Sequence, residues 1–162
     1  MNISSMASRF AKQETCFTRS SNSCKIQSIF MSLVICRQVD FSTPAYENTV
    51  ALRYDVLRKP LGLNFTKEQL QQEANDFHLA AYMDEDLAAC LILTVADTYE
   101  IKMRQVAVKD GLQGKGIGKK LVQFAENFAV EKGFRLMTLH ARETAVAFYL
   151  SMQYKTKGQP FT

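Results

Sequence analysis

The stretch VAVKDGLQGKGIGKKL, from Val106 to Leu121, decides the fold. An alternating apolar run ends at Asp110, and glycines then occupy every second position from Gly114 to Gly118, among lysines. Apolar residues at helical spacing follow. The stretch therefore predicts a strand, a positively charged glycine-rich turn and a helix.

Neither of two common phosphate-binding motifs fits this turn. The P-loop motif needs different spacing and a hydroxyl after its lysine, and the dinucleotide fingerprint needs a third glycine where Lys119 stands. The pattern that remains is Q-x-x-G-x-G, formed by Gln113, Gly116 and Gly118. The first N–H groups of a helix are unpaired and positive, and glycine lets an anion approach them. The turn predicts a phosphate site, although a plain strand-to-helix connection also explains its glycines.

Apolar periodicity predicts the other elements on both sides of this stretch. Strands are expected at residues 32–39, 77–83, 87–95, 100–108 and 134–141 with a partial strand from 154, and helices at 42–60, 66–76, 117–132 and 143–152. A helix between two strands implies a parallel pair at the glycines, and short hairpins imply antiparallel pairs before it. The predicted fold class is mixed α/β, with a central, largely antiparallel sheet flanked by helices.

Composition excludes several classes of protein. Residues 1–30 hold four basic and one acidic side chain, and the remaining residues hold 16 basic and 15 acidic ones, so the main body is nearly neutral. Because nucleic-acid binding needs a clustered basic face, no nucleic-acid partner is expected. No apolar run reaches the roughly 20 residues that span a bilayer, so no membrane partner is expected either. Four cysteines without a C-x-x-C pair predict neither a zinc site nor disulfides, and favour a cytoplasmic location.

The first 30 residues differ from the remainder. They are rich in serine, carry spaced basic residues and lack the apolar core of a secretory signal. This composition is typical of an organellar transit peptide, of a disordered extension, or of a stretch preceding a start at Met31. We therefore expect residues 1–30 to lie outside the fold and residues 31–162 to form one domain.

Two motifs together resemble the GNAT (GCN5-related) N-acetyltransferase superfamily. The stretch 106–121 looks like its acetyl-CoA pyrophosphate loop, and AVAFYLSMQY, residues 145–154, resembles its F-Y-x-x-x-G-[FY] helix, with Gln153 in place of the glycine. LRYDVLRKPLGL and LHARETAVAFY further resemble a small bacterial-type branch. The resemblance covers residues 32–162 and implies the GNAT fold, with the parallel pair at the cofactor slot.

The resemblance also implies a cofactor site. The backbone from Gln113 to Gly118 would cradle the pyrophosphate of acetyl-CoA, and main-chain groups near Val106 and Val108 would bind the pantetheine arm. A bulge or splay between this strand and the strand at 134–141 would open the slot for the thioester. The full set of expected cofactor-binding residues is Val106, Ala107, Val108, Gln113, Gly114, Lys115, Gly116, Ile117, Gly118 and Lys119. No metal is expected.

Three residues are candidates for the chemistry. Tyr149 matches the tyrosine that can protonate the departing thiolate in the family, although a core aromatic also fits its spacing. Glu100 and His140, at the ends of neighbouring strands, are candidate bases, and solvated strand ends are the alternative. Glu100 has the same strand parity as Val106, so the two would share a face if no bulge intervenes.

The implied function is transfer of an acetyl group from acetyl-CoA to a primary amine, on a small molecule or a peptide. Arg53 and Arg58 could face an acidic group of the acceptor, or form surface salt bridges, and His78 fits a structural role. A non-catalytic acyl-CoA-binding module and a nucleotide binder are the alternatives. The short C-terminus predicts an incomplete last strand, whose open edge would allow a homodimer.

Overall fold

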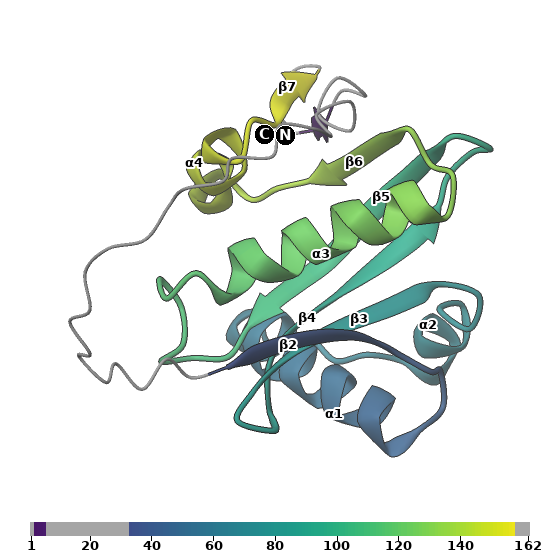
Figure 1. Ribbon diagram of the computed structural model, residues 1–162. Helices are drawn as coiled ribbons and strands as arrows, with labels where there is room; N and C mark the ends of the chain where they lie inside the picture. The colour runs from purple at the N-terminus through teal and green to yellow at the C-terminus, as the bar shows by residue number, and fades with distance from the viewer. Residues whose placement is uncertain (1, 6–32, 158–162) are drawn as a thin grey trace, which may run out of the picture.

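The computed structural model describes residues 2–5 and 33–157, and these form one seven-stranded sheet with helices on both faces (Figure 1). The strand order is β2-β3-β4-β5-β6-β1-β7. The strands are β1 (Asn2–Ser5), β2 (Val34–Val39), β3 (Phe77–Met83), β4 (Asp86–Val95), β5 (Glu100–Val108), β6 (Leu136–His140) and β7 (Lys155–Lys157). The mixed fold predicted from the sequence is confirmed.

The strands from β2 to β5 form an antiparallel meander, and β5 and β6 form the predicted parallel pair. The α-helices are α1 (Pro44–Arg53), α2 (Lys67–Gln71), α3 (Ile117–Glu131) and α4 (Glu143–Ser151). A π-helix, η2 (Tyr54–Arg58), and a 3₁₀ turn, η3 (Lys59–Leu61), extend α1. The helix α3 lies in the connection between β5 and β6, as is usual for a parallel pair.

Local sequence explains where the helices begin. Thr43 caps α1, since its hydroxyl accepts from the Tyr46 N–H at 3.2 Å, and Pro44 needs no donor in the first turn. Thr66 and Gln69 form a capping box at α2. The helix α3 begins after Gly116 without any side-chain cap, so its first N–H groups have no side-chain partner.

The sheet separates two cores. Beneath α3, buried residues of β3, β4 and β5 pack against the apolar face of the helix, with Leu121, Val122 and Ala125 fully buried. On the opposite face, α1 covers a smaller cluster that includes Cys90 and Ala107. β5 contributes to both cores and is the central strand of the sheet.

The first residues differ from the prediction. Asn2–Ser5 forms β1, which lies between β6 and β7 and pairs antiparallel with both. These four residues are therefore part of the fold, because the short last strand leaves β6 an edge that accepts another strand. Residues 6–30 lie outside the described part of the chain. The predicted last strand is present as β7, and residues 158–162 also lie outside the described part.

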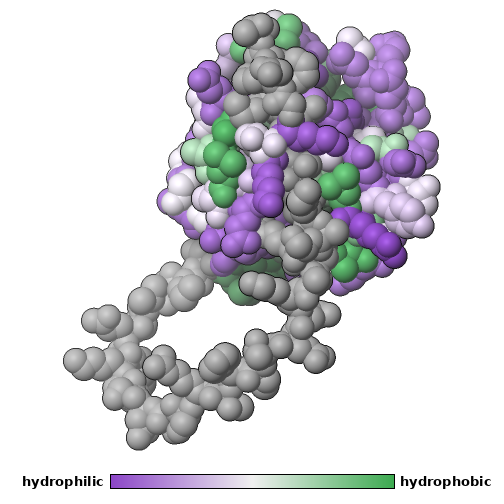
Figure 2. Space-filling view, turned by 90° about the horizontal axis from the view of Figure 1, so that it is seen from above, coloured by the Kyte–Doolittle hydropathy of each residue, from purple (hydrophilic) through white to green (hydrophobic). Residues whose placement is uncertain are grey.

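Seen from above, the described surface is mostly hydrophilic, with separate hydrophobic patches (Figure 2). Within residues 2–5 and 33–157, no helix is both long and apolar enough to cross a membrane. Cys36 and Cys90, the two cysteines that the structure describes, carry free thiols.

Candidate active site

A β-bulge interrupts β5. The register with β4 shifts between Cys90 and Ile92, where two β5 residues, Gln105 and Val106, oppose a single residue. Gln105 has a φ of 50°, in the left-handed region that side chains other than glycine seldom adopt. The bulge therefore depends on contacts that hold this backbone in place.

The bulge reverses the alternation of β5 side chains between the two faces of the sheet. Met103 belongs to the core beneath α3, whereas Ala107, four residues later, belongs to the cluster beneath α1. Residues an even number apart lie on the same face of a regular strand, so the bulge has reversed the alternation. Glu100 and Val106 consequently lie on opposite faces, because the condition for a shared face, a strand without a bulge, is not met.

A slot opens between β5 and β6 just before the bulge. Pairing of the two strands ends at Met103 and Leu139, and the rest of β5 has no partner on β6. The N–H of Lys109 donates to β4 at 2.8 Å. Since backbone groups alternate along a strand, Val106 and Val108 direct their N–H and C=O groups towards the slot. The predicted splay lies between β5 and β6, and the bulge itself faces β4.

The glycine-rich turn lies at the end of β5. Gly114 and Gly116 have φ angles of 76° and 80°, and a Cβ on either would meet nothing within 4 Å. Gly118 is different, because a Cβ there would approach Val108 Cγ2 at 3.3 Å. The first two glycines thus leave open backbone, and the third lets α3 pack closely on the strand.

The other residues of the predicted cofactor set surround this turn. The side chains of Lys115 and Lys119 are exposed at its rim, and Ile117 is buried as the first residue of α3. Gln113 Nε2 donates to the Val108 carbonyl at 3.3 Å and so ties the turn to the strand. Backbone N–H groups and lysines at a helix N-terminus are the groups that bind a pyrophosphate.

Tyr149, on α4, is 5% exposed and packs in the core beneath α3. Burial raises the pKa of its phenol to about 12, so the group keeps its proton at neutral pH. Its ring lies edge-on to Phe148 and to Tyr154, at centroid distances of 5.0 and 5.6 Å. A phenol held protonated can act as a proton donor.

The candidate bases lie elsewhere. Glu100 is at the start of β5 and accepts a hydrogen bond from Thr138 Oγ1 at 2.8 Å. Val106 lies six residues further along the strand, roughly 20 Å away along β5. His140 is exposed at the end of β6, and partial burial and the charge of Lys102 lower its pKa. Neither residue lines either of the two cavities described below.

A buried polar network on the α1 side of β5 was not foreseen from the sequence. Arg53 and Glu73, 1% and 2% exposed, form a two-bonded ion pair at 2.9 and 3.0 Å. Arg53 Nη1 also donates to Gln105 Oε1 at 2.7 Å, and Gln105 Nε2 donates to Glu73 Oε1 at 3.2 Å. Arg53 is therefore buried in an ion pair, and the surface salt bridge considered for it is wrong.

Two further residues complete the network around Glu73. The hydroxyl of Tyr46 donates to Glu73 Oε2 at 3.1 Å, and His78 Nε2 lies 3.0 Å from the Glu73 backbone oxygen. Burial, followed by the charge of Glu73, raises the pKa of Tyr46 to about 12. Burial lowers the pKa of His78, which is thus neutral and structural in position. Only spatial proximity, which the sequence does not reveal, joins these residues.

A polar cavity of about 400 Å³ adjoins this network on the α2 side of β5. It is lined by Arg58, Phe65, Gln69, Gln72, Glu73, Asp76, Thr94, Arg104 and Gln105. Arg104 forms an ion pair with Asp76 at 3.0 Å, and Arg58 lies over the Phe65 ring at 4.7 Å. Because Gln105 belongs to the bulge, this cavity reaches the point where β5 opens.

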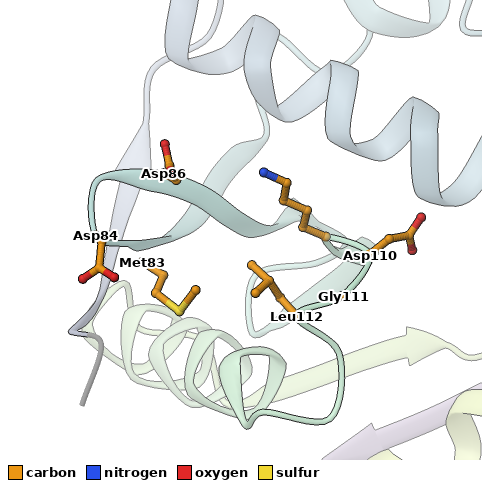
Figure 3. Close-up of a pocket in the computed structure, with 7 residues that line it drawn as sticks. Met83, Asp84, Asp86, Asp110, Gly111 and Leu112 are labelled. Atoms are coloured by element: carbon orange, nitrogen blue, oxygen red, sulfur yellow. The ribbon is translucent and has the colours of Figure 1, made fainter. Parts of the chain in front are cut away.

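A second cavity, of about 320 Å³, lies between the β3–β4 turn and the start of the glycine-rich turn (Figure 3). Met83 and Leu112 face one another across it, and the carboxylates of Asp84 and Asp110 point away from it. Asp86 contributes a third acidic side chain. Lys109 contributes a basic side chain, so the lining is of mixed charge. Among the described residues, no group of three His, Cys, Asp or Glu side chains could hold a metal ion.

Comparisons with a family model and with individual proteins both match this chain to acetyltransferases. The model of the Acetyltransferase (GNAT) family matches residues 42–154. The uncharacterized N-acetyltransferase YitI of Bacillus subtilis (strain 168) is 24% identical over 131 residues, covering 76% of this chain and 87% of that protein.

The fold is shared with solved structures of other acetyltransferases, among them the following two. An aminoglycoside acetyltransferase from an uncultured soil sample, in complex with sisomicin, has a TM-score of 0.66 at 19% identity, covering 80% of this chain and 93% of that one. Glucosamine-6-phosphate N-acetyltransferase from Arabidopsis thaliana has a TM-score of 0.61 at 14% identity, covering 80% and 97%.

Proposed function

The chain belongs to the GNAT acetyltransferase family, and on that premise we propose that it transfers the acetyl group of acetyl-CoA to a primary amine of a small polar acceptor. One observation carries the proposal. The bulge, the unpaired part of β5 and the glycine-rich turn follow one another within residues 105–118, so that one continuous path is offered to a long, phosphorylated thioester.

The donor would bind along this path. The N–H groups at the start of α3, with Lys115 and Lys119 at the rim, suit the pyrophosphate. Val106 and Val108 would pair with the amides of the pantetheine arm, as an added strand does. Acetyl-CoA supplies the activated acetyl thioester. A backbone N–H near Val106 would stabilise the charge that develops on the carbonyl oxygen.

The acceptor would enter from the polar cavity beside Gln105. Its lining is mainly charged or amide side chains, and Phe65 is its one aromatic ring. Such a lining favours a polar amine over an apolar one, because every buried polar group needs a partner. A peptide terminus or a small polar amine both fit this chemistry.

Proton transfer completes the reaction. An alkyl amine is mostly protonated at neutral pH and must lose a proton before it attacks. Glu100 and His140 line neither cavity, so we assign this proton to water in the polar cavity. Tyr149, whose phenol stays protonated, would donate to the departing thiolate. Exchange of Glu100 for Gln should therefore change kcat by less than about threefold, because a true general base contributes at least about 100-fold.

The test has two stages. Calorimetric titration of acetyl-CoA should show binding, and a panel of polar amines and peptides should then release free CoA, with the acetylated product verified by mass spectrometry. Tight CoA binding without product from any amine would favour the non-catalytic module instead. Absence of acetyl-CoA binding by folded protein would overturn the proposal entirely.

A further inference from the structure

The inference starts from the strained residue in β5. Gln105 carries a side chain, yet its φ of 50° is one that glycine adopts freely and other residues avoid. Such a conformation persists only when the surroundings hold it. The bulge that Gln105 forms with Val106 lies directly beyond the last part of β5 that pairs with β6, at the start of the slot.

The surroundings hold Gln105 by both ends of its amide. Its Oε1 accepts from Arg53 at 2.7 Å, and its Nε2 donates to Glu73 at 3.2 Å. Arg53 and Glu73 in turn fix one another through two parallel bonds, the geometry that gives the most orientation. The clamp comes from α1 and the segment after α2, on the face of the sheet away from α3.

Stability alone is a poor reason for this clamp. A buried ion pair loses so much hydration that apolar residues of the same size often stabilise a protein equally well. Glu73 also accepts from Tyr46, so its two oxygens receive all the donors they need and leave it little capacity to act as a base. The arrangement is better suited to orienting a neighbour than to chemistry.

We propose that Arg53 and Glu73 are positioning residues, which hold Gln105 in its left-handed conformation and thereby fix the β5 backbone donor against the thioester carbonyl. Neither residue touches the donor in this proposal. The inference rests on the proposed acetyl transfer, because the placed backbone group matters only if a carbonyl is attacked there.

Two substitutions of Gln105 separate conformation from chemistry. Gln105→Met keeps the size of the side chain but removes both hydrogen bonds, and Met strongly disfavours this φ. We expect kcat to fall about tenfold or more, with the KM for acetyl-CoA within about threefold. Gln105→Gly also lacks the amide but adopts this φ at no cost, so it should retain several times the kcat of Gln105→Met. Equal losses would mean that the amide itself contacts the acceptor, and would overturn the proposal.

A double-mutant cycle tests the clamp. Arg53→Lys keeps the buried charge and loses the two-bonded geometry, so it should lower kcat in the wild-type background. In the Gln105→Gly background, the same substitution should change kcat much less, because the clamp no longer decides the backbone conformation. Independent effects in the two backgrounds would contradict the proposal, as would unchanged kcat in Arg53→Lys.

A second readout needs no acceptor. Hydrogen exchange of the amides at residues 105–107 should be faster in Gln105→Met and Arg53→Lys than in the wild type, while exchange in α3 stays the same. If no amine is acetylated although acetyl-CoA binds, the proposed function fails, and exchange still reports whether the clamp holds the bulge. Unchanged exchange at these amides would overturn the inference by itself.

Discussion

The two sides of β5 are built differently. On the slot side, the groups proposed to bind the donor lie within one run of the chain, Val106 to Lys119, and are mostly backbone. On the α1 side, the face of the sheet that α1 covers, the groups come from α1, the segment after α2 and the bulge, separated by 20 to 52 residues, and are buried side chains. The slot side depends on open backbone, and the α1 side on a closed set of charges.

This difference determines which substitutions each side tolerates. Ligand binding to open backbone is weakened when a side chain is added, whereas a closed network is destabilised when a side chain is removed. The slot side should therefore be sensitive in ligand binding and insensitive in folding. The α1 side should show the reverse, and substitutions on the two sides test this contrast.

The largest effect is expected from removing a charge of the network. Arg53→Met leaves the Glu73 carboxylate buried without its cation, and breaking a buried pair in this way costs about 3–5 kcal/mol. Urea unfolding measures the loss in free energy of unfolding. Lys119→Met, which removes an exposed cation on the slot side, should change that free energy by less than about 0.5 kcal/mol. Similar small changes in both variants would contradict the contrast.

For ligand binding, in contrast to folding, the slot side should be the more sensitive one. Gly116→Asp places a carboxylate where the pyrophosphate is proposed to bind, and like charges about 4 Å apart near a surface repel by about 4 kcal/mol. In calorimetry we expect the dissociation constant for acetyl-CoA to rise at least 100-fold. Gly133→Asp is the matched control, because Gly133 has a similar φ of 90° and open surroundings at the other end of α3. Equal affinities of the two variants would exclude the turn as the phosphate site.

The same contrast explains how much the sequence predicted. The order of elements, the parallel pair and the glycine-rich turn follow from periodicity and motif spacing, which are local. The family resemblance predicted a bulge or splay beside this strand, but the sequence did not place the bulge at Gln105, because its φ is held by side chains distant in sequence. Nothing in the sequence indicated that Glu73 is buried, because a single Glu in a polar helical segment is normally exposed to solvent. The pairing of β1 was also not predicted, because so short a polar strand shows no alternation of apolar and polar residues.

Tyr149 tests the chemistry on the slot side. Tyr149→Phe keeps the ring and removes the proton donor, so kcat should fall about 100-fold with acetyl-CoA affinity unchanged. Because its pKa is raised to about 12, the loss should be constant between about pH 6 and pH 9. Tyr154→Phe, in the same core and also buried, is the control and should retain most of the activity. A comparable loss in both variants would point to packing instead of proton donation.

The smallest effect concerns pH and the α1 side. Burial lowers the pKa of His78 below its ordinary value of 6.5, so the folded state binds the proton less readily than the unfolded chain. His78 therefore contributes stability that is fully present above about pH 6.5 and declines as the pH falls, by at most about 1.4 kcal/mol per pH unit. His78→Gln should flatten the fall in unfolding free energy between pH 7.5 and pH 5. His140→Gln should flatten it much less, because His140 is exposed and solvent screens the effects that lower its pKa. Equal slopes in the two variants would show that the buried network does not govern the acid sensitivity of the fold.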